Sequence, residues 1–343
     1  MNWSKQDTMA NAVTSNNDNF KPAFGLKNFH VQTLLSSSGP RKWHISKAFQ
    51  NHRAKQQEMI LDCGEDSRLQ GFYNLAGTQR SNKLLILIHG WEGSHESTYM
   101  LSAAQTILGA GIDVFRLNLR DHGDTHHLNR GLFYSTLIDE VVTAIKLVQD
   151  KFTYNECYLA GFSLGGNFAL RVAALAQTNS LRLNKVLAFC PAVHAGTSND
   201  ALHESRNWLY HQYFVRRWKR SLLKKAQHWP EYDFARSLLN LKSLNDMNHA
   251  LIPKYTEFSD VDDYFEAYAI SGEALNSVSM PCYLHFAKDD PIIPVIGSNS
   301  IAKNPLLDIS ITDYGGHCGF LENWAGESWQ NKRLYECLLD TKV

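Results

Sequence analysis

The sequence lacks an excess of either charge and lacks long apolar runs. Its 343 residues carry 34 basic and 34 acidic side chains, so the formal net charge is zero. No run approaches the roughly 18 apolar residues that a membrane helix needs, and the first residues contain no apolar segment typical of a secretion signal. Without a basic field the chain is not expected to bind nucleic acid.

Cysteine is scarce and shows no paired spacing. The chain has six: Cys63, Cys157, Cys190, Cys282, Cys318 and Cys337. None forms a C-x-x-C pair, which argues against a disulfide framework or a zinc site and predicts buried, reduced thiols in a cytoplasmic protein. Cys318 follows His317, but adjacent residues in an extended turn point apart, so the sequence does not favour a cysteine nucleophile.

The pattern of apolar residues predicts one α/β domain. Residues 1–19 are rich in Asn, Ser, Thr and Asp and predict a disordered tail, followed by a single domain over 20–343. Expected strands lie at 58–62, 69–75, 84–88, 112–117, 157–160, 186–189, 280–287 and 309–312. Expected helices between them lie at 98–108, 135–149 and 165–176. This alternation predicts a mostly parallel sheet, opened by an antiparallel pair and covered by helices on both faces.

Between residues 191 and 280 the pattern changes to aromatic and charged residues without a clear apolar strand. Helical patterns at 204–225 and 264–270 predict an inserted helical cap at about 195–275. Because it follows the strand at 186–189, this cap is expected to lie over the carboxyl ends of the strands, where active sites of such sheets are found.

The most informative motif is Gly-Phe-Ser-Leu-Gly-Gly at 161–166. It stands between an expected strand and an expected helix, which is the context of a nucleophile elbow, with Ser163 at the corner. So sharp a turn leaves room only for small residues two positions either side, and Gly161 and Gly165 supply them. The turn predicts that Ser163 is the nucleophile of a serine hydrolase.

An acid and a base follow in the order that this chemistry requires. Asp289 and Asp290 end the strand at 280–287, and His317 stands among glycines after the strand at 309–312. The order Ser, Asp, His at strand ends matches the α/β-hydrolase arrangement. Of the two carboxylates, Asp290 is preferred as the acid of the triad, because Pro294 lies four residues beyond it. Asp289 is kept as the alternative acid. The backbone amides of Trp91, after the strand at 84–88, and of Leu164 are the expected oxyanion donors.

The chain resembles the YheT-like branch of the α/β-hydrolases, a group of serine esterases with a helical cap. The resemblance rests on Phe20-Lys21-Pro22, on the segment Asn-Phe-His-Val-Gln-Thr-Leu at 28–34, and on His-Gly-Trp-Glu-Gly at 89–93. It covers most of the chain from about residue 20 onward. It implies hydrolysis of short to medium acyl esters or monoacylglycerol-like lipids.

Two further segments of the sequence each allow two interpretations. Residues 216–225 hold six basic side chains, with Trp218 and Leu222 one helical turn apart, which fits either a peripheral contact with anionic lipid or a solvated helix packed on the core. The loop at 121–127 contains His122, His126 and His127, but adjacent histidines do not readily face one ion, so a polar loop is favoured over a metal site.

Together these features predict a serine hydrolase that cleaves carboxylic esters by a triad of Ser163, His317 and Asp290 and needs no cofactor or metal. The expected partner is a small-molecule or lipid ester. An acyltransferase or a thioesterase on the same triad stays open, because water and other acceptors compete for one acyl-enzyme. A non-catalytic interaction protein is the weaker alternative, since the triad is intact. Oligomeric state is not encoded in any visible pattern.

Overall fold

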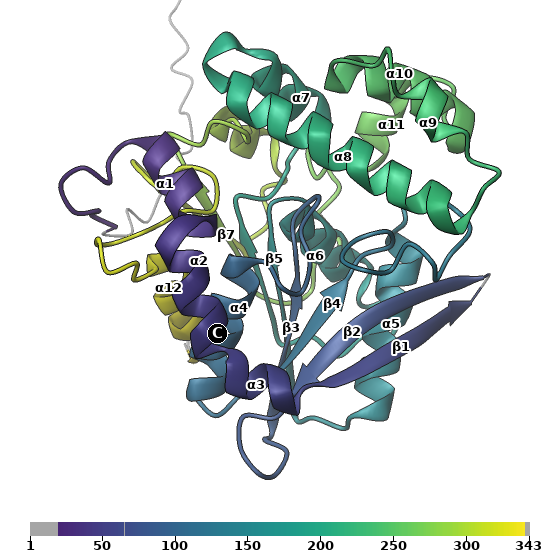
Figure 1. The fold of residues 1–343 in the computed structure, drawn as a ribbon. Helices are drawn as coiled ribbons and strands as arrows, with labels where there is room; N and C mark the ends of the chain where they lie inside the picture. Colours follow the sequence, from purple (N-terminus) through teal and green to yellow (C-terminus); the bar gives the residue numbers. More distant parts are fainter. Residues whose placement is uncertain (1–19, 65, 340–343) are drawn as a thin grey trace, which may run out of the picture.

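The expected strands join into a single sheet in the computed structural model, which describes residues 20–64 and 66–339 (Figure 1). The predicted tail at 1–19 lies outside these residues. Within the described part the sheet has eight strands in the order β1-β2-β4-β3-β5-β6-β7-β8. They are β1 (Gln57–Gly64), β2 (Ser67–Asn74), β3 (Lys83–Ile88), β4 (Asp113–Asn118), β5 (Glu156–Phe162), β6 (Lys185–Phe189), β7 (Cys282–Ala287) and β8 (Leu307–Thr312).

The sheet is mostly parallel, as predicted. Strand β2 pairs antiparallel with β1 and with β4, whereas every other neighbouring pair is parallel. Parallel strands bring their carboxyl ends to one edge of the sheet, so the loops after β3, β5, β7 and β8 open at the same side. The fold therefore collects at one edge the segments that the motifs singled out.

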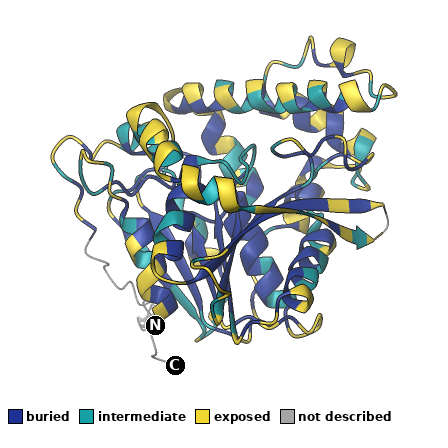
Figure 2. Ribbon diagram, turned by 60° about the horizontal axis from the view of Figure 1, so that its bottom comes forward, coloured by how far each residue is buried: buried dark blue, intermediate teal, exposed yellow. Residues whose placement is uncertain are grey.

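Helices cover both faces of the sheet, because the strand side chains alternate between two apolar layers. Leu84, Ile86 and Ile88 of β3 join one buried cluster, and Leu85 and Leu87 join the other. The first layer packs under α5 (Ile138–Lys151) and α6 (Leu164–Leu175), and the second under α2 (Gly39–Ala48), α4 (Thr98–Gly109) and α12 (Trp329–Leu339) (Figure 1). Figure 2 shows the buried sheet between these partly exposed helices.

The segment between β6 and β7 is helical and lies over the carboxyl edge of the sheet (Figure 1). We call it the helical layer. It consists of α7 (Ala195–His203), a 3-10 turn (Ser205–Asn207), α8 (Trp208–His228), α9 (Phe234–Ser237), α10 (Leu244–Tyr255) and α11 (Val261–Ala267). Along α8, Tyr210 and Leu222 are buried, and Phe214 and Trp218 pack against the same core. Trp218 and Leu222, which the sequence places one helical turn apart, thus face inward.

The sequence missed the helices α1 (Phe29–Ser37), α2, α3 (Gln50–Lys55) and α12. The buried residues of α1 are the polar Gln32 and Ser36, and α2 and α3 have no buried residue. Periodic apolar residues are the main signal for a helix in a sequence, and α1, α2 and α3 offer little of it. Helix α12 does bury Leu334, Cys337 and Leu338 at helical spacing, so its pattern was present in the sequence and was overlooked. A second 3-10 turn, Val295–Ser300, follows β7.

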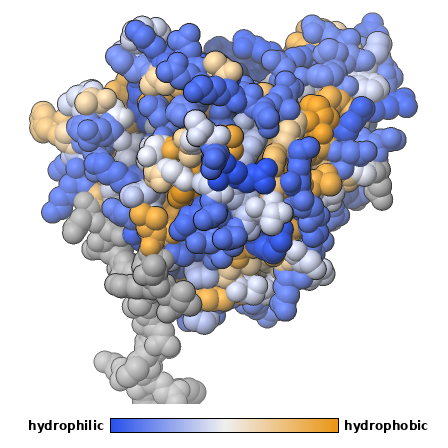
Figure 3. Space-filling model, turned by 90° about the horizontal axis from the view of Figure 1, so that it is seen from below, coloured by the Kyte–Doolittle hydropathy of each residue, from blue (hydrophilic) through white to orange (hydrophobic). Residues whose placement is uncertain are grey.

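The face of the molecule that lies away from the helical layer is mostly hydrophilic, with apolar residues in small groups (Figure 3). Among the helices of the described residues, none has the length and apolar character required to cross a bilayer.

A buried ion pair ties the helical layer to the sheet. Lys225 of α8 donates through Nζ to Asp121 Oδ1 at 2.8 Å and to the carbonyls of Asn129 and Gly131. The side chains of Lys225 and Asp121 are 1% and 6% exposed. Burial raises the pKa of Asp121 to about 6, against the opposing effect of Lys225. Each member of the pair therefore depends on the other for its charge.

Replacing Lys225 by Met should lower the free energy of unfolding by about 3 to 5 kcal/mol, because Asp121 then stays buried without its cation. The neighbouring Lys224→Met is the matched control. Lys224 pairs with Asp124, whose side chain is 95% exposed, so its loss should cost under about 1 kcal/mol. Urea unfolding of both variants measures the difference, and equal losses would contradict the role given to the buried pair.

Candidate active site

Ser163 stands at the corner between β5 and α6, as the motif predicted. Its backbone adopts φ 55° and ψ −122°, a conformation that non-glycine residues rarely adopt. A Cβ atom at Gly161 would lie 2.0 Å from the carbonyl oxygen of Gly165, and one at Gly165 would lie 2.4 Å from that of His89. Only glycine fits at both positions, so these two residues permit the strained turn that presents Ser163.

The loop after β3 packs directly against this turn. A Cβ atom at Gly90 would lie 3.1 Å from Cβ of Ser163. The amide of Gly90 donates to the hydroxyl of Tyr99 at 3.0 Å, and the amide of Gly93 donates to the carbonyl of Gly90 at 2.9 Å. The loop is thus held in a tight turn beside Ser163, with Trp91 at its tip.

Leu164 is the first residue of α6, so its amide belongs to the unpaired amino end of that helix. The first amides of a helix carry partial positive charge, which favours a developing anion. Trp91 and Leu164 line the same pocket as Ser163. The two residues expected to supply oxyanion donors therefore line one pocket with the serine.

His317 and Asp290 meet at the carboxyl ends of β8 and β7, which are paired neighbours in the sheet. His317 donates through Nδ1 to Asp290 Oδ2 at 2.9 Å. Asp290 Oδ1 also accepts the amides of Ile292 and Ile293, at 2.8 and 2.9 Å. The carboxylate, whose side chain is 1% exposed, is thereby fixed in position, and it orients the imidazole.

Asp289 has a different partner. Its Oδ1 accepts the amide of Gly316 at 2.8 Å, so it braces the turn that carries His317. Burial raises the pKa of Asp289 to about 6, against the opposing effect of the amide hydrogen bonds. The structure therefore distinguishes the two neighbours that the sequence left open, since Asp290 is the one that contacts the imidazole.

The pKa of His317 is set by two opposing effects. Burial lowers it, but the negative charge of Asp290 and the hydrogen bond to that carboxylate favour the protonated ring, and the pKa rises to about 9. A nearby carboxylate stabilises the imidazolium by this charge interaction. His317 is consequently a stronger base than an ordinary histidine, whose pKa is about 6.5.

Sequence reasoning missed the residues that support the His317 loop from α1. The amide of His317 donates to the Thr33 hydroxyl at 2.9 Å. Gln32, fully buried, donates through Nε2 to the carbonyls of Leu26 and Leu321 and accepts the amide of Leu321. The only sequence signal was the segment at 28–34, which carries the family resemblance but shows no pattern that predicts a contact with the site.

The end of β6 joins the serine to the histidine loop. The carbonyl of Phe189 accepts the amide of Ser163 at 2.8 Å and lies 3.5 Å from Sγ of Cys318, which donates to it. Cys318 therefore reaches the rear of the serine turn from the residue next to His317. One carbonyl thus links the segments that carry Ser163 and His317.

The expectation that His317 and Cys318 point apart is wrong. One ligand atom from each of Cys190, His317 and Cys318 lies within 4.8 Å of the other two. The turn is not extended, because Gly316 and Cys318 both adopt φ 53°. A left-handed residue turns the chain back on itself and brings consecutive side chains to the same side.

A pocket opens at Ser163 beneath the helical layer. It contains about 890 Å³ of empty space, including the part open to solvent. Its walls are mainly aromatic and aliphatic, with contributions from Trp91, Phe214, Trp218, Leu202, Phe265 and Ile293. The Trp91 ring stacks on Phe214 and meets Trp218 edge-on, at centroid distances of 5.2 and 5.4 Å. An apolar group attached to the reacting carbon would be well accommodated here.

The histidines of the loop at 121–127 have separate partners. His122 is buried, and its Nδ1 lies 2.7 Å from the carbonyl of Arg120. His126 Nε2 lies 2.8 Å from the hydroxyl of Ser221 on α8. Burial lowers the pKa of both rings, to about 4 for His122 and about 3 for His126. The two rings hydrogen-bond to different parts of the protein and do not face a common position where a metal ion could bind.

Comparisons with known proteins agree with this architecture. An Abhydrolase domain-containing protein of Dictyostelium discoideum is 23% identical over 97% of this chain and 82% of its own length. Phospholipase ABHD3 of Homo sapiens is 22% identical over 76% of this chain, which spans only 64% of the human protein. Among solved structures, the Pyrococcus furiosus esterase Pf2001 superposes with a TM-score of 0.54 at 18% identity, over 82% of this chain and 89% of that one.

A second solved structure, the 2,6-dihydroxy-pseudo-oxynicotine hydrolase, gives a TM-score of 0.55 at 13% identity, over 83% of this chain and 68% of that one. At such identities the structural likeness concerns the fold. The sequence itself matches the alpha/beta hydrolase family over residues 85–327, a span that contains the serine turn, the Asp290–His317 pair and the helical layer. The chain therefore belongs to the alpha/beta hydrolase family.

Proposed function

We propose that this protein is a serine hydrolase that cleaves carboxylic esters through an acyl-enzyme, with Ser163, His317 and Asp290 as its triad. The observation that carries the proposal is the 2.9 Å hydrogen bond between His317 and Asp290 at the sheet edge that also presents Ser163 in its strained turn. A nucleophile, a base and a carboxylate that orients the base are the parts that acyl transfer requires.

The reaction would run in two steps. His317 takes the proton of Ser163 as the serine oxygen attacks the ester carbonyl, and Asp290 stabilises the imidazolium that forms. The amides of Trp91 and Leu164 hold the oxyanion, each contributing on the order of 3 kcal/mol. His317 then protonates the leaving alkoxide. Water, activated by the same histidine, releases the acid, and no cofactor takes part in the scheme.

The apolar pocket supports an acyl chain as the group that is bound, and we propose short to medium acyl esters or monoacylglycerol-like lipids as substrates. The names of the relatives, among them phospholipases, support a lipid ester. We also propose that the chain belongs to the YheT-like branch. The segment at 28–34, which carries that resemblance, supplies the hydroxyl of Thr33 to His317.

Two further assignments follow from the arrangement of the chain. We propose that residues 195–275 act as a cap, since the helical layer supplies Phe214 and Trp218 to the pocket wall and would shield the reaction from bulk water. We propose a reducing compartment such as the cytoplasm, supported by the six cysteines, none of which forms a disulfide in the described part of the chain.

Ser163→Ala should lower the turnover of p-nitrophenyl esters by a factor of about 10⁴ or more, because no other oxygen can form the acyl-enzyme. Its melting temperature should stay nearly unchanged, since only one hydroxyl is lost. Ser198→Ala is the matched control, because Ser198 lines the same pocket on α7. A fluorophosphonate probe should label the parent and the control but not Ser163→Ala; labelling of that variant would refute the assignment of the nucleophile.

Asp290→Asn should lower kcat by about 10³ to 10⁴, because the amide cannot stabilise the imidazolium and favours the wrong tautomer. Asp289→Asn should cost far less, since its oxygen can still accept the amide of Gly316. The reaction needs neutral His317, so kcat/KM of the parent should rise with pH through a midpoint above 6.5. That midpoint should fall in Asp290→Asn but not in Asp289→Asn. The reverse ranking of the two variants would assign the acid to Asp289.

We further propose that the exposed side of α8 makes a peripheral contact with anionic lipid. Leu209, Tyr213 and Leu223 are 57%, 53% and 42% exposed. The exposed Arg216 and Arg220 lie between Tyr213 and Leu223 at helical spacing. Aromatic and aliphatic side chains interleaved with arginine suit the interface between lipid head groups and acyl chains.

The protein should therefore sediment with vesicles that contain phosphatidylserine and not with purely phosphatidylcholine vesicles. Arg216→Glu with Arg220→Glu should reduce the bound fraction severalfold, because the charge attraction to the anionic surface is reversed. Lys42→Glu with Lys47→Glu makes the same change of charge on α2 and should have little effect. Equal sedimentation of both double variants would show that this face of α8 is not the lipid-binding surface.

A further inference from the structure

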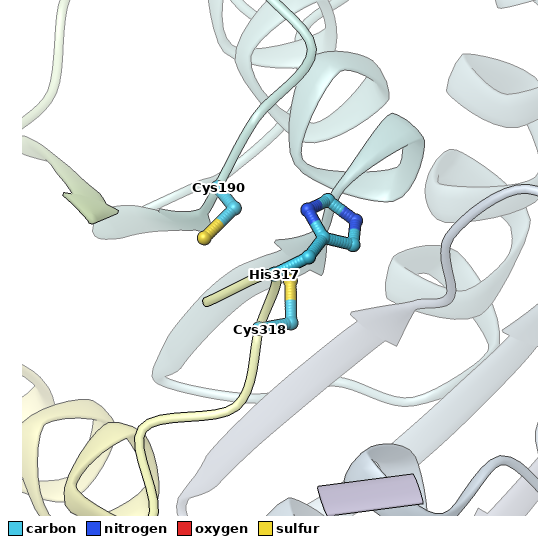
Figure 4. A group of neighbouring side chains, drawn as sticks. All are labelled: Cys190, His317 and Cys318. Carbon is cyan, nitrogen blue, oxygen red and sulfur yellow. The ribbon is translucent and has the colours of Figure 1, made fainter. Parts of the chain in front are cut away.

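The structure brings two cysteine thiols close to the imidazole of His317, the proposed base. Cys190 follows β6 directly, and His317 and Cys318 lie in the turn after β8, so the two cysteines are 128 positions apart in the sequence (318 − 190). Figure 4 shows the three side chains gathered in one place. Among the described residues, no other group of three or more His, Cys, Asp or Glu side chains has its ligand atoms this close together.

We propose that Cys190, Cys318 and His317 form a binding site for a soft divalent metal ion such as Zn²⁺, and that an ion bound there stops the ester hydrolysis proposed above. Two sulfurs and one imidazole nitrogen are a ligand set that zinc prefers, with a fourth position left open. The inhibition, but not the binding, rests on the proposed function.

The geometry is close to what such an ion needs. In a tetrahedral site with metal–sulfur bonds of about 2.3 Å, the two sulfurs would be about 3.8 Å apart. The three ligand atoms already lie within 4.8 Å of one another, so movements of about 1 Å would close the site. Two thiolates and a neutral imidazole also balance the charge of a divalent ion, and a neutral complex costs least to bury.

The supporting backbone is well fixed at each ligand. The amide of Cys190 donates to the carbonyl of His285 at 2.7 Å. The amide of His317 is held by Thr33, and Sγ of Cys318 lies against the carbonyl of Phe189. Both cysteines are buried, at 0% and 6% exposed. The ligands are therefore held in place before any ion binds.

Occupancy would remove His317 from the reaction whichever ring nitrogen binds. A metal on Nε2 blocks the atom that must accept the proton of Ser163. A metal on Nδ1 displaces the hydrogen bond to Asp290 and forces the remaining proton onto Nε2, which then can no longer act as a base. The ion would act as a reversible inhibitor and not as a cofactor.

The first test is inhibition of p-nitrophenyl ester hydrolysis by Zn²⁺ in the presence of a phosphine reductant. Chelator should restore the full rate. Cys190→Ser and Cys318→Ser, each measured against its own uninhibited rate, should need about tenfold more Zn²⁺ or higher, because each loses a ligand. Serine suits both positions, since the carbonyls of Gly316 and Phe189 that face the two sulfurs can accept its hydroxyl.

Cys63→Ser is the matched control, because Cys63 lies on β1 away from the cluster, and its inhibition should equal that of the parent. Undiminished inhibition in both Cys190→Ser and Cys318→Ser would overturn the proposal and assign the effect to other ligands. Inhibition that reductant prevents and chelator does not reverse would also overturn it, since that behaviour indicates a disulfide.

Direct binding separates this inference from the proposed function. Co²⁺ added to Ser163→Ala, which keeps all three ligands, should give a thiolate-to-metal charge-transfer band. That band should disappear when Cys190→Ser or Cys318→Ser is added to Ser163→Ala. The band supports the metal site even if the parent protein proves to hydrolyse no ester. Its absence in a folded Ser163→Ala protein would overturn the site, whatever the esterase assays show.

Discussion

The close packing of the serine turn against the end of β3 is the contact on which the site depends. Gly165 approaches the carbonyl oxygens of Ile88 and His89 so closely that a Cβ atom would stand 2.4 Å from each. This contact holds Ser163 in its left-handed conformation and brings the loop of Trp91 beside it. A side chain at Gly165 would separate the two strand ends, and the nucleophile and both expected oxyanion donors would lose their common position.

Segments from distant parts of the chain hold the loops around that contact in place. The N-terminal helix α1 holds the amide of His317 through Thr33 and anchors the following segment through Gln32. The helical layer is fixed to the loop after β4 by the buried pair of Lys225 and Asp121. The geometry of the candidate site and the stability of the fold are therefore coupled, because the same loops that face the pocket also carry the buried polar contacts.

The same convergence explains why two cysteines lie beside the proposed base. The carboxyl ends of β5, β6 and β8 meet at the carbonyl of Phe189, which accepts hydrogen bonds from the amide of Ser163 and from Sγ of Cys318. A buried thiol next to an imidazole can bind a metal ion as well as pack against its neighbours. Because the fold brings the strand ends to one edge of the sheet, it places the two thiols close to His317. The proposed inhibition by Zn²⁺ follows from that placement.

The sequence by itself determined the parallel sheet and the positions of Ser163 and His317 at strand ends, because these depend on short local patterns: apolar runs, flanking glycines and a strand-to-helix corner. It located the helices that carry a clear apolar period and missed α1, whose buried residues are polar. Only the tertiary structure distinguished the contacts of Asp289 from those of Asp290, since both follow β7 and their partners, Gly316 and His317, are about 27 residues away. It also decided the contacts that Thr33 and Cys190 make, because contacts across more than 100 residues depend on strand order and on left-handed turns that no local pattern specifies.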